Sequence, residues 1–492
     1  MEGYIKKEDR KTILFLADDM RLPSGIGTMT KELILGNTHR YNFIHVGAAV
    51  NHPDVGKILD ISSDVSKETG VEDSSVLIYP YNGYGDPDLI RLLIDRHNID
   101  AIVHFTDPRY WIWLYRMSAE VRQRVPIFYY HIWDDLPAPH YNKPYYESCD
   151  LLMGISKQSY NISKLVLGKD KFVDLDSNPP KDLIAKNLPK VSFVPHGINE
   201  QHFFPIDRSD AKVQVMRKNL FKGADPDFVL FYNNRNIRRK MTSDAILAFK
   251  LFHDMLPKDN TPDVRFVLHT QSADENGTDL PAVIDAICPD LIDKILITDS
   301  RLSTDQMNIL YNCCDTVINI ASNEGWGLSS TEALMTGRTL INNVTGGLQD
   351  QCRFEDENGD WINFDDDFAS NHAGKYKGHG KWVFPVFPAA INLQGSIPTP
   401  YIFDDRCNIR DVANAIWYWY TYDVKGREEC GLAGREWATS SEAGFTAKAM
   451  AGKFSNSIDT VLENWVAPSR FNVYNVKKEI ESNKHKKSGI SI

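Results

Sequence analysis

Two carboxylates stand eight residues apart in the run Asn323-Glu-Gly-Trp-Gly-Leu-Ser-Ser-Thr-Glu332. The run follows an apolar segment, so Glu324 is expected on a loop after a strand and Glu332 about two turns into the next helix. Gly325 and Gly327 would leave backbone N–H groups free at the start of that helix, where an anionic or hydroxyl-rich ligand can dock. Because each carboxylate accepts hydrogen bonds, the pair could hold two different sugars of one extended ligand. A capped surface helix with incidental acids is the alternative interpretation.

Positively charged residues gather at the end of another expected strand. Arg235 leaves the end of the strand expected at residues 228–234, and Lys240 follows five residues later, near the start of the next helix. An arginine fork, a compact lysine charge and the positive end of the helix dipole can together hold a diphosphate. Arg238 and Arg239 add two further cations, which is unusual in an acidic protein. A solvated basic turn is the alternative interpretation.

A glycine-containing turn, Pro23-Ser-Gly-Ile-Gly27, follows the first expected strand at residues 12–17. Gly25 and Gly27 would let the backbone pass close to a ligand, and a helix beginning near Thr28 would offer free N–H groups to an anion. An ordinary turn between a strand and a helix would use the same residues, so this signal is weak by itself.

A histidine ends the apolar strand expected at Ile127–His131. His131 is either a core histidine with satisfied hydrogen bonds or a hydrogen-bonding or acid–base group at the mouth of the sheet. His104, on the preceding strand, is a rival for the same role. The run Val194-Pro-His-Gly-Ile-Asn199 also ends a strand, and Gly197 permits a sharp turn there.

These residues need a scaffold that brings strand ends together. Short apolar runs rich in β-branched and aromatic residues alternate with amphipathic stretches, which is typical of parallel sheets with helices on both faces. Ligands bind such sheets beyond the carboxyl ends of the strands. The set is too long for one sheet, so we expect two Rossmann-like, doubly wound parallel-sheet domains with a break near residues 204–212. The expected strands are residues 12–17, 42–49, 76–79, 101–105, 127–131, 151–156, 191–196, 228–234, 264–270, 295–298, 316–321 and 339–344.

Composition limits the possible classes of protein. The chain has 492 residues, and a domain size of about 150 residues predicts two or three domains. A formal net charge of −11 makes general nucleic-acid binding unfavourable, although a local basic groove is compatible with it. No apolar run approaches the ~20 residues of a membrane span, and the N-terminus has no apolar signal-peptide core. The seven cysteines are scattered without a Cys-x-x-Cys pair, which favours the reducing cytoplasm over a disulfide scaffold or a zinc cluster.

Three segments depart from the alternation of strands and helices. Residues 168–189 are polar and rich in Lys, Asp and Pro, so they are expected as a surface excursion. Residues 352–407 form a long stretch without clear periodicity, and a loop of that length is usually functional or mobile. The basic residues 477–487 are expected to be a solvated end of the chain.

Together these motifs resemble the family 4 glycosyltransferases, which share the two-domain GT-B fold. The resemblance covers both halves of the chain in the family's order. It departs from the family in the glycine turn, which lacks a double glycine at its start, in Met241, where a glycine is common, and in the insertion at residues 352–407. The resembling residues are Gly25–Gly27, Val194–Asn199, Arg235 with Lys240, Glu324 and Glu332 in EGWGLSSTE, Ala333–Gly337 and Gly346-Gly347.

The resemblance implies a retaining transfer of a sugar from a nucleotide diphosphate sugar, such as a UDP- or GDP-sugar, without a metal or another cofactor. Arg235 and Lys240 would bind the diphosphate, Glu332 the ribose and Glu324 the transferred sugar. His131 would face the donor sugar. The implied catalytic residues are therefore His131, Glu324, Arg235 and Lys240. The implied donor-binding residues are Gly25, Gly27, Arg235, Lys240, Glu324, Gly325, Trp326, Gly327, Leu328, Ser329 and Glu332.

Domain limits follow from the same comparison and from the strand pattern. An acceptor domain is expected at residues 1–205 and a nucleotide-sugar domain at residues 206–465, with the insertion inside the second. A C-terminal helix at about residues 466–492 is expected to pack back on the first domain.

The hydroxyl acceptor stays open at this stage. A polysaccharide, a lipid-linked sugar, a small metabolite or a hydroxymethylated base in DNA could serve, and the acidic charge disfavours the last. Residues 110–115, 140–146 and 352–407 could line an acceptor cleft, since aromatic faces stack on sugars and bases, or they are packing residues. A GT-B phosphorylase and a non-catalytic nucleotide-sugar-binding scaffold are the alternative functions.

Overall fold

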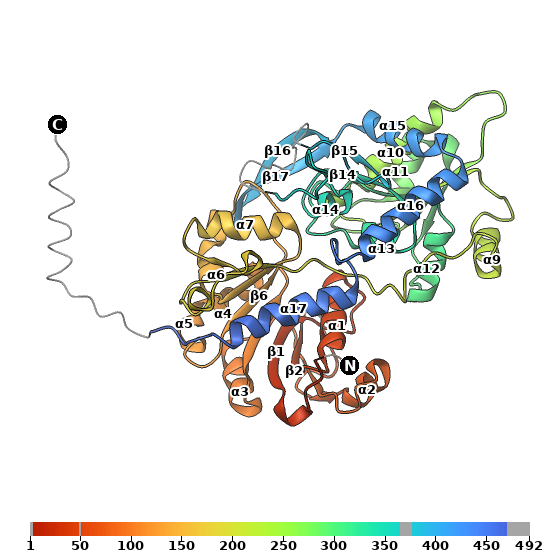
Figure 1. Ribbon diagram of the computed structural model, residues 1–492. Helices are drawn as coiled ribbons and strands as arrows, with labels where there is room; N and C mark the ends of the chain where they lie inside the picture. The colour runs from red at the N-terminus through yellow and green to blue at the C-terminus, as the bar shows by residue number, and fades with distance from the viewer. Residues whose placement is uncertain (1–2, 49–50, 365–375, 470–492) are drawn as a thin grey trace, which may run out of the picture.

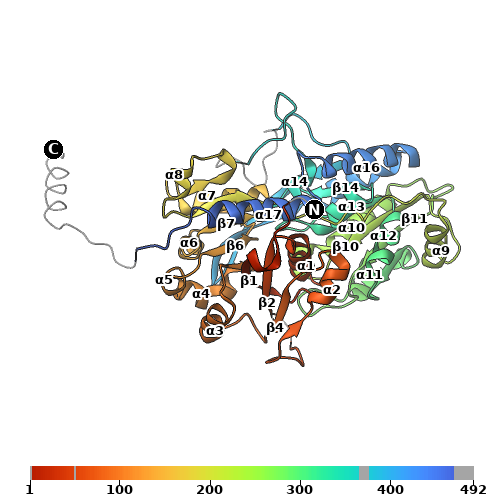
Figure 2. The same cartoon turned by 60° about the horizontal axis from the view of Figure 1, so that its bottom comes forward.

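The computed structural model describes residues 3–48, 51–364 and 376–469. Two open sheets form two lobes that lie side by side (Figures 1 and 2). The first sheet has nine strands in the order β3-β4-β2-β1-β5-β6-β7-β9-β8, and the second has six in the order β12-β11-β10-β13-β14-β15. Neighbouring strands in both sheets are parallel, except that β3 runs antiparallel to β4. The expected architecture of two parallel sheets is confirmed.

The strands and helices have the following bounds. The strands of the first sheet are β1 (Lys11–Asp18), β2 (Tyr41–Ala48), β3 (Leu59–Asp60), β4 (Val76–Pro80), β5 (Ala101–Phe105), β6 (Ile127–His131), β7 (Leu151–Gly154), β8 (Val173–Asp174) and β9 (Lys190–Phe193). Those of the second are β10 (Phe228–Asn233), β11 (Val264–His269), β12 (Ile295–Thr298), β13 (Thr316–Asn319), β14 (Thr339–Asn343) and β15 (Val383–Val386), followed by the separate hairpin β16 (Pro388–Ser396) and β17 (Thr399–Cys407). The helices are α1 (Gly25–Asn37), α2 (Ser62–Thr69), α3 (Pro87–His97), α4 (Ile112–Arg116), α5 (Ser118–Val121), α6 (Lys143–Glu147), α7 (Lys157–Leu167), α8 (Lys181–Ile184), α9 (Ala211–Leu220), α10 (Thr242–Asp254), α11 (Leu280–Ile287), α12 (Thr304–Asn312), α13 (Leu328–Met335), α14 (Leu348–Cys352), α15 (Ile409–Thr421), α16 (Val424–Thr439) and α17 (Ala447–Leu462).

In each sheet the strand order reverses beside the strand that comes first in the chain. In the first sheet β1 lies between β2 and β5, and in the second β10 lies between β11 and β13. The connections on either side of such a point leave toward opposite faces, which opens a crevice beyond the carboxyl ends of the strands. Each lobe therefore has one place suited to a ligand, after β1 and β5 in the first lobe and after β10 and β13 in the second.

The last long helix, α17, returns from the second lobe to the first (Figure 1). The Ile198 N–H donates to the Phe445 carbonyl at 2.9 Å, and the Ala447 N–H donates to the Ile198 carbonyl at 3.0 Å, where the chain crosses over. The Tyr41 hydroxyl then donates to Asp459 on α17 at 2.6 Å. The helix expected at residues 466–492 lies outside the described residues from residue 470 onward, and the domain limits stay a prediction.

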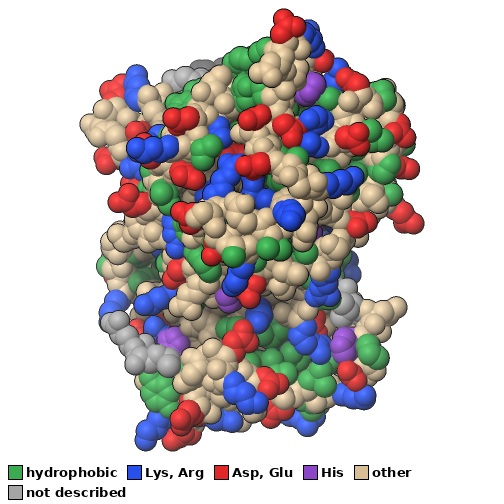
Figure 3. All heavy atoms as spheres, turned by 90° about the vertical axis from the view of Figure 1, so that its right-hand side faces the viewer, with side chains coloured by type: hydrophobic (Ala, Val, Ile, Leu, Met, Phe, Trp, Pro, Cys, Tyr) green, Lys and Arg blue, Asp and Glu red, His purple; other side chains and the backbone are tan. Residues whose placement is uncertain are grey.

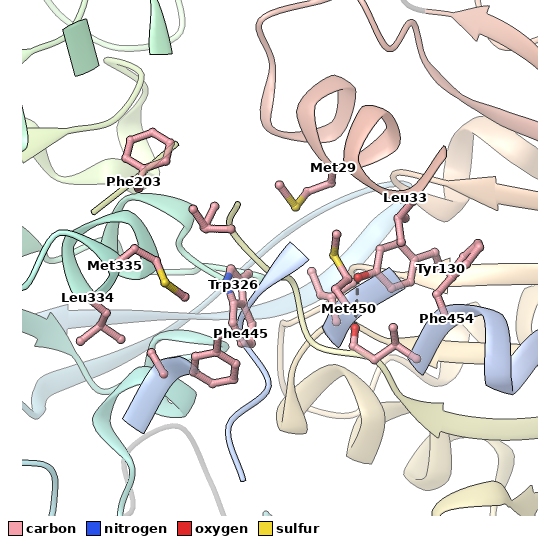
Figure 4. Packing of buried hydrophobic residues seen from close by; sticks show 14 of the residues in the cluster. Met29, Leu33, Tyr130, Phe203, Trp326, Leu334, Met335, Phe445, Met450 and Phe454 are labelled. Atoms are coloured by element: carbon pink, nitrogen blue, oxygen red, sulfur yellow. Dashed lines mark hydrogen bonds between the residues drawn. The ribbon is translucent and has the colours of Figure 1, made fainter. Parts of the chain in front are cut away.

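One hydrophobic core runs through both lobes. Phe15 and Tyr130 from the first sheet, Phe454 from α17, and Trp326 and Met335 from the second lobe belong to the same buried cluster. Figure 4 shows how α17 and the segment before it join the two sides of this cluster. Apolar burial is worth about 25 cal/mol per Å², so a shared core binds the lobes firmly to each other.

The insertion holds more regular structure than the sequence predicts. Within residues 352–407, β15 extends the second sheet and β16 and β17 form a hairpin. Residues 389–396 of β16 are solvent-exposed, so this strand has no buried face and lacks the apolar pattern that identifies a strand in sequence. Part of the insertion, residues 365–375, lies outside the described residues.

The surface and the cysteines set the general character of the molecule. Acidic and basic side chains are interspersed over the face seen in Figure 3. All seven cysteines are free thiols. Among the described residues no helix is long and apolar enough to cross a membrane, and no group of three or more His, Cys, Asp or Glu side chains could hold a metal ion.

Candidate functional site

A cleft of about 1830 Å³ separates the two lobes at the carboxyl ends of their strands. It receives residues from the turns after β1 and β6 in the first lobe and after β10 and β13 in the second. The four charged residues singled out in sequence all line this cleft: Arg235, Lys240, Glu324 and Glu332.

The turn after β10 places its cations at different depths. Arg235 is exposed at the rim, where its Nε donates to Asp274 Oδ2 at 2.8 Å. A short 3₁₀ turn then carries Arg239 and Lys240 inward. Arg239 Nη1 lies 3.0 Å from Glu324 Oε2, and the buried Lys240 Nζ donates to the same oxygen. The expected cation corner and the expected first acid are thus in direct contact.

Glu324 and Lys240 are both charged at neutral pH. Burial raises the pKa of Glu324, but the adjacent Lys240 and Arg239 lower it by more, so its pKa lies below the usual range. Burial lowers the pKa of Lys240 to about 8 in spite of the attraction of Glu324. Both cations contact Oε2 of Glu324, so among the described residues Oε1 is left to accept hydrogen bonds from a ligand.

Glu332 lies further along the cleft on α13. The Tyr311 hydroxyl donates to its Oε2 at 2.5 Å, and Asn233 Nδ2 donates at 3.3 Å. Burial raises the pKa of Glu332 to about 7 despite these two hydrogen bonds. The carboxylate is therefore held in one orientation and still has acceptor capacity for hydroxyl groups.

The start of α13 is open to a ligand. Gly327 precedes the helix with φ +89°, a left-handed conformation that favours glycine, and no side chain of the described ranges caps the helix. Its first residues, Leu328 and Ser329, line the cleft, and their backbone N–H groups are not capped by a side chain of the described residues. Gly25 of the first lobe lies so close that a Cβ there would sit 3.3 Å from Leu328 Cδ1. The two glycine-containing turns, far apart in sequence, meet across the cleft.

Two further expected site residues are held by contacts within the protein, although Trp326 also lines the cleft. The Gly27 N–H donates to the Ser24 hydroxyl at 3.0 Å, and a Cβ on Gly27 would lie 2.7 Å from the Leu22 carbonyl oxygen, so this glycine serves the turn itself. Trp326 is 2% exposed, and its Nε1 donates to Thr331 at 2.9 Å.

His131 does not line the cleft. It is fully buried, with its ring 5.0 Å from that of Tyr129 and 4.8 Å from that of Tyr146, and both its ring nitrogens lack a hydrogen-bond partner among the described residues. Side chains alternate along a strand, and His131 shares the face of Tyr129, which packs into the first lobe rather than toward the second. Burial lowers the pKa of His131 to about 3, so it is neutral.

No role was predicted from sequence for Asp134, Asp135 and His196, which line the cleft. Asp134 and Asp135 come after β6, and His196 comes after β9. The Tyr130 hydroxyl lies 2.9 Å from His196 Nδ1, and the histidine ring packs against Trp326 of the other lobe at 6.1 Å. All three follow parallel strands of one sheet, so the rule that ligands bind beyond strand ends could have identified them.

No protein-family model matches the chain, and no curated protein matches its sequence. Solved structures do match. The Anabaena protein HepE in complex with UDP and glucose aligns with a TM-score of 0.59 at 13% identity, covering 92% of this chain and 100% of that one. Sucrose-phosphate synthase from Thermosynechococcus elongatus aligns with a TM-score of 0.61 at 13% identity, covering 92% of this chain and 100% of that one. A glycosyltransferase from Rickettsia africae aligns with a TM-score of 0.58 at 14% identity, covering 93% and 100%.

The chain has the GT-B fold. At these identities the likeness establishes the arrangement of the two lobes, and the chemistry has to come from the residues of this chain. In this GT-B chain, the acids after β13 and the cations after β10 meet in the cleft between the lobes.

Proposed function

We propose that the protein is a retaining glycosyltransferase, which moves a sugar from a nucleotide diphosphate sugar to a hydroxyl acceptor. The supporting observation is that Arg235, Lys240, Glu324 and Glu332 line one cleft beside the uncapped start of α13. Structures with this fold include HepE with UDP and glucose bound. The free thiols of all seven cysteines are consistent with a reducing compartment, and we place the protein in the cytoplasm.

The donor's diphosphate would lie between the two lobes. Lys240, Arg235 and the start of α13 supply the positive charge that the leaving diphosphate needs, so we propose donor cleavage without a metal. One preorganised donor aimed at a developing charge is typically worth about 3 kcal/mol. Glu332 would accept hydrogen bonds from the ribose hydroxyls, because its carboxylate is already oriented by Tyr311 and Asn233.

The transferred sugar would lie at Glu324. Lys240 gains a second anionic partner when the diphosphate binds, and Glu324 Oε1 can accept hydrogen bonds from sugar hydroxyls. As the bond between the anomeric carbon and the phosphate oxygen breaks, its electron pair leaves with the diphosphate. The acceptor oxygen attacks from the same face and its proton passes to the leaving phosphate oxygen, so the step retains configuration without a protein nucleophile.

A donor panel tests this function. The purified chain is heated with UDP, GDP, UDP-sugars and GDP-sugars, and we expect one nucleotide series to raise its melting temperature. The best donor is then assayed for release of the nucleoside diphosphate. Formation of a sugar 1-phosphate from inorganic phosphate would indicate a phosphorylase instead. A stabilising donor that is never turned over with any acceptor or with water would indicate a binding scaffold.

A further inference from the structure

The first lobe contributes a carboxylate to the cleft opposite Glu324. Asp134 is the third residue after β6, and it lines the cleft. Its Oδ2 would lie 3.3 Å from a Cβ on Gly346, a residue whose own Cβ position is 2.1 Å from the Glu324 carbonyl oxygen. Asp134 is therefore close to the loop that carries Glu324, although the two residues belong to different lobes.

The charged groups that face Asp134 are those of the proposed donor site. Arg239 and Lys240 face it from the turn after β10, and Glu324 faces it from the turn after β13. Asp135, its neighbour in the chain, adds a further carboxylate. Burial raises the pKa of Asp134, and Glu324 adds to this rise, whereas Arg239 and Lys240 act against it.

Unlike its neighbour, the Asp134 carboxylate accepts no hydrogen bond from another side chain among the described residues. Asn323 Nδ2 donates to Asp135 Oδ1 at 2.6 Å, whereas the hydrogen bond to the Asp134 carboxylate comes from the backbone of Asp134 itself. Asp134 is partly exposed where it lines the cleft, so its carboxylate oxygens can still accept hydrogen bonds from a ligand. Such a group in a cleft, beside the charges of a ligand site, is characteristic of residues that act on a ligand.

We propose that Asp134 binds the transferred sugar from the side of the first lobe: its carboxylate accepts hydrogen bonds from the sugar hydroxyls, and its negative charge stabilises the positive charge that develops on the ring. This inference rests on the proposed function. Asp134 and Glu324 then hold the sugar from opposite lobes, while Lys240 and Arg235 hold the diphosphate. The assignment also accounts for His131, which the resemblance placed at this position but which is buried in the first lobe.

The test compares Asp134→Asn with the wild-type enzyme at saturating concentrations of the best donor. Asparagine has nearly the same shape but no charge, so we expect kcat to fall about 10²-fold, with a smaller change in the KM for the donor. Wild-type kcat should fall as the pH is lowered below neutrality, and this decline should be absent in the variant. The melting temperature should stay close to the wild-type value, because no other side chain among the described residues donates a hydrogen bond to this carboxylate.

Asp244→Asn is the matched control. Asp244 is a carboxylate on α10 whose pKa burial also raises, and it does not line the cleft. This variant should keep the wild-type decline in kcat at low pH. A wild-type kcat that does not change with pH would overturn the inference even if Asp134→Asn failed to fold.

The results distinguish a failure of the proposed role of Asp134 from a failure of the proposed function. If the wild-type chain turns over a donor and Asp134→Asn matches it in kcat and pH profile, only the role of Asp134 is wrong. A lower melting temperature with an unchanged pH profile would also overturn it, because it would indicate a structural role. If the wild-type chain binds and turns over no nucleotide sugar, the proposed function fails and this inference fails with it.

Discussion

Protonation of Glu332 should have a measurable effect on the affinity for the nucleotide. Burial raises the pKa of this carboxyl group to about 7, so the free protein binds a proton there below neutrality. Ribose hydroxyls donate hydrogen bonds and so favour the ionised carboxylate. The charged form of Glu332 predominates only above about pH 7. The affinity for the nucleotide should therefore decrease as the pH falls through that value, by up to about tenfold for each further pH unit.

Calorimetric titration of the best nucleoside diphosphate at pH values above and below this pKa checks the prediction. Glu332→Gln should bind weakly and with little pH dependence over the same range. Tyr311→Phe offers a second check, because it removes the hydroxyl that donates to Glu332 and should raise the carboxyl pKa further. Equal affinity of the wild-type chain at both pH values would exclude Glu332 as the ribose ligand.

At the scale of elements, the contact of α1 with α17 joins the C-terminal segment to the first lobe. A Cβ on Gly36 of α1 would lie 2.6 Å from the Ala451 Cβ on α17, so Gly36→Ala must push the two helices apart. Overpacking of this kind typically destabilises by about 1–3 kcal/mol. Gly452→Ala is the control, since no atom in the described part of the chain lies within 4 Å of its Cβ position. Alanine in place of glycine within a helix should stabilise by up to about 1 kcal/mol.

Chemical denaturation of the three proteins measures both effects. The two alanine substitutions should move the transition midpoint in opposite directions. Destabilisation of the two variants by the same amount would mean that the helices do not pack as closely as described.

The β16–β17 hairpin is the element that links the two lobes over the cleft. The Phe403 N–H donates to the Leu136 carbonyl of the first lobe at 2.6 Å, while Asn323 of the second lobe donates to the Phe403 carbonyl. Arg109 Nη1 donates to the Thr399 hydroxyl at 2.8 Å. A two-stranded hairpin is marginally stable by itself, so these contacts with both lobes hold it in place.

Shortening the hairpin tests its role. Asn392 lies opposite Asp404, so residues between them can be replaced by a short glycine turn without displacing the strand ends. We expect donor binding to be kept, because Glu332 is held by Tyr311 and Asn233 and not by the hairpin. Hydrolysis of the donor by water should increase, because the cleft becomes more open. Unchanged hydrolysis of the donor by the shortened protein would contradict this role.

Several elements could be predicted from the sequence because burial imposes a pattern on them. The strands before Arg235 and Glu324 are buried on both faces, so their apolar runs identify them and place both residues at strand ends. The exposed β16 carries no such pattern. His131 was assigned to the cleft incorrectly, because the end of a strand does not reveal which face of the sheet its last side chain occupies.

At the scale of the whole molecule, charge argues against a nucleic-acid acceptor. The formal net charge is −11, and basic residues on the first-lobe side of the cleft already have carboxylate partners. Arg21 pairs with Asp19 at 2.5 Å, and Lys31 pairs with Glu68 at 2.8 Å. Nucleic-acid affinity comes mainly from cations that are free to neutralise phosphates. We expect no shift of duplex or single-stranded DNA in a gel at about 0.15 M salt, whereas the donor still binds.

Hydroxymethylated DNA should likewise accept no sugar when it is incubated with the chain and the best donor. Transfer of sugar to that DNA in the presence of the best donor would contradict it, and would require cations in the cleft to exchange their carboxylate partners for phosphates.

The central claim is that cations after β10 and acids after β13 act together on one activated sugar. The most direct measurement is the rate at which the best donor releases its nucleoside diphosphate, in the wild-type chain beside Glu324→Gln and Lys240→Met. We expect turnover by the wild-type chain and a loss of at least about 10²-fold in each variant, with the fold intact by circular dichroism. Wild-type rates in both variants would contradict it.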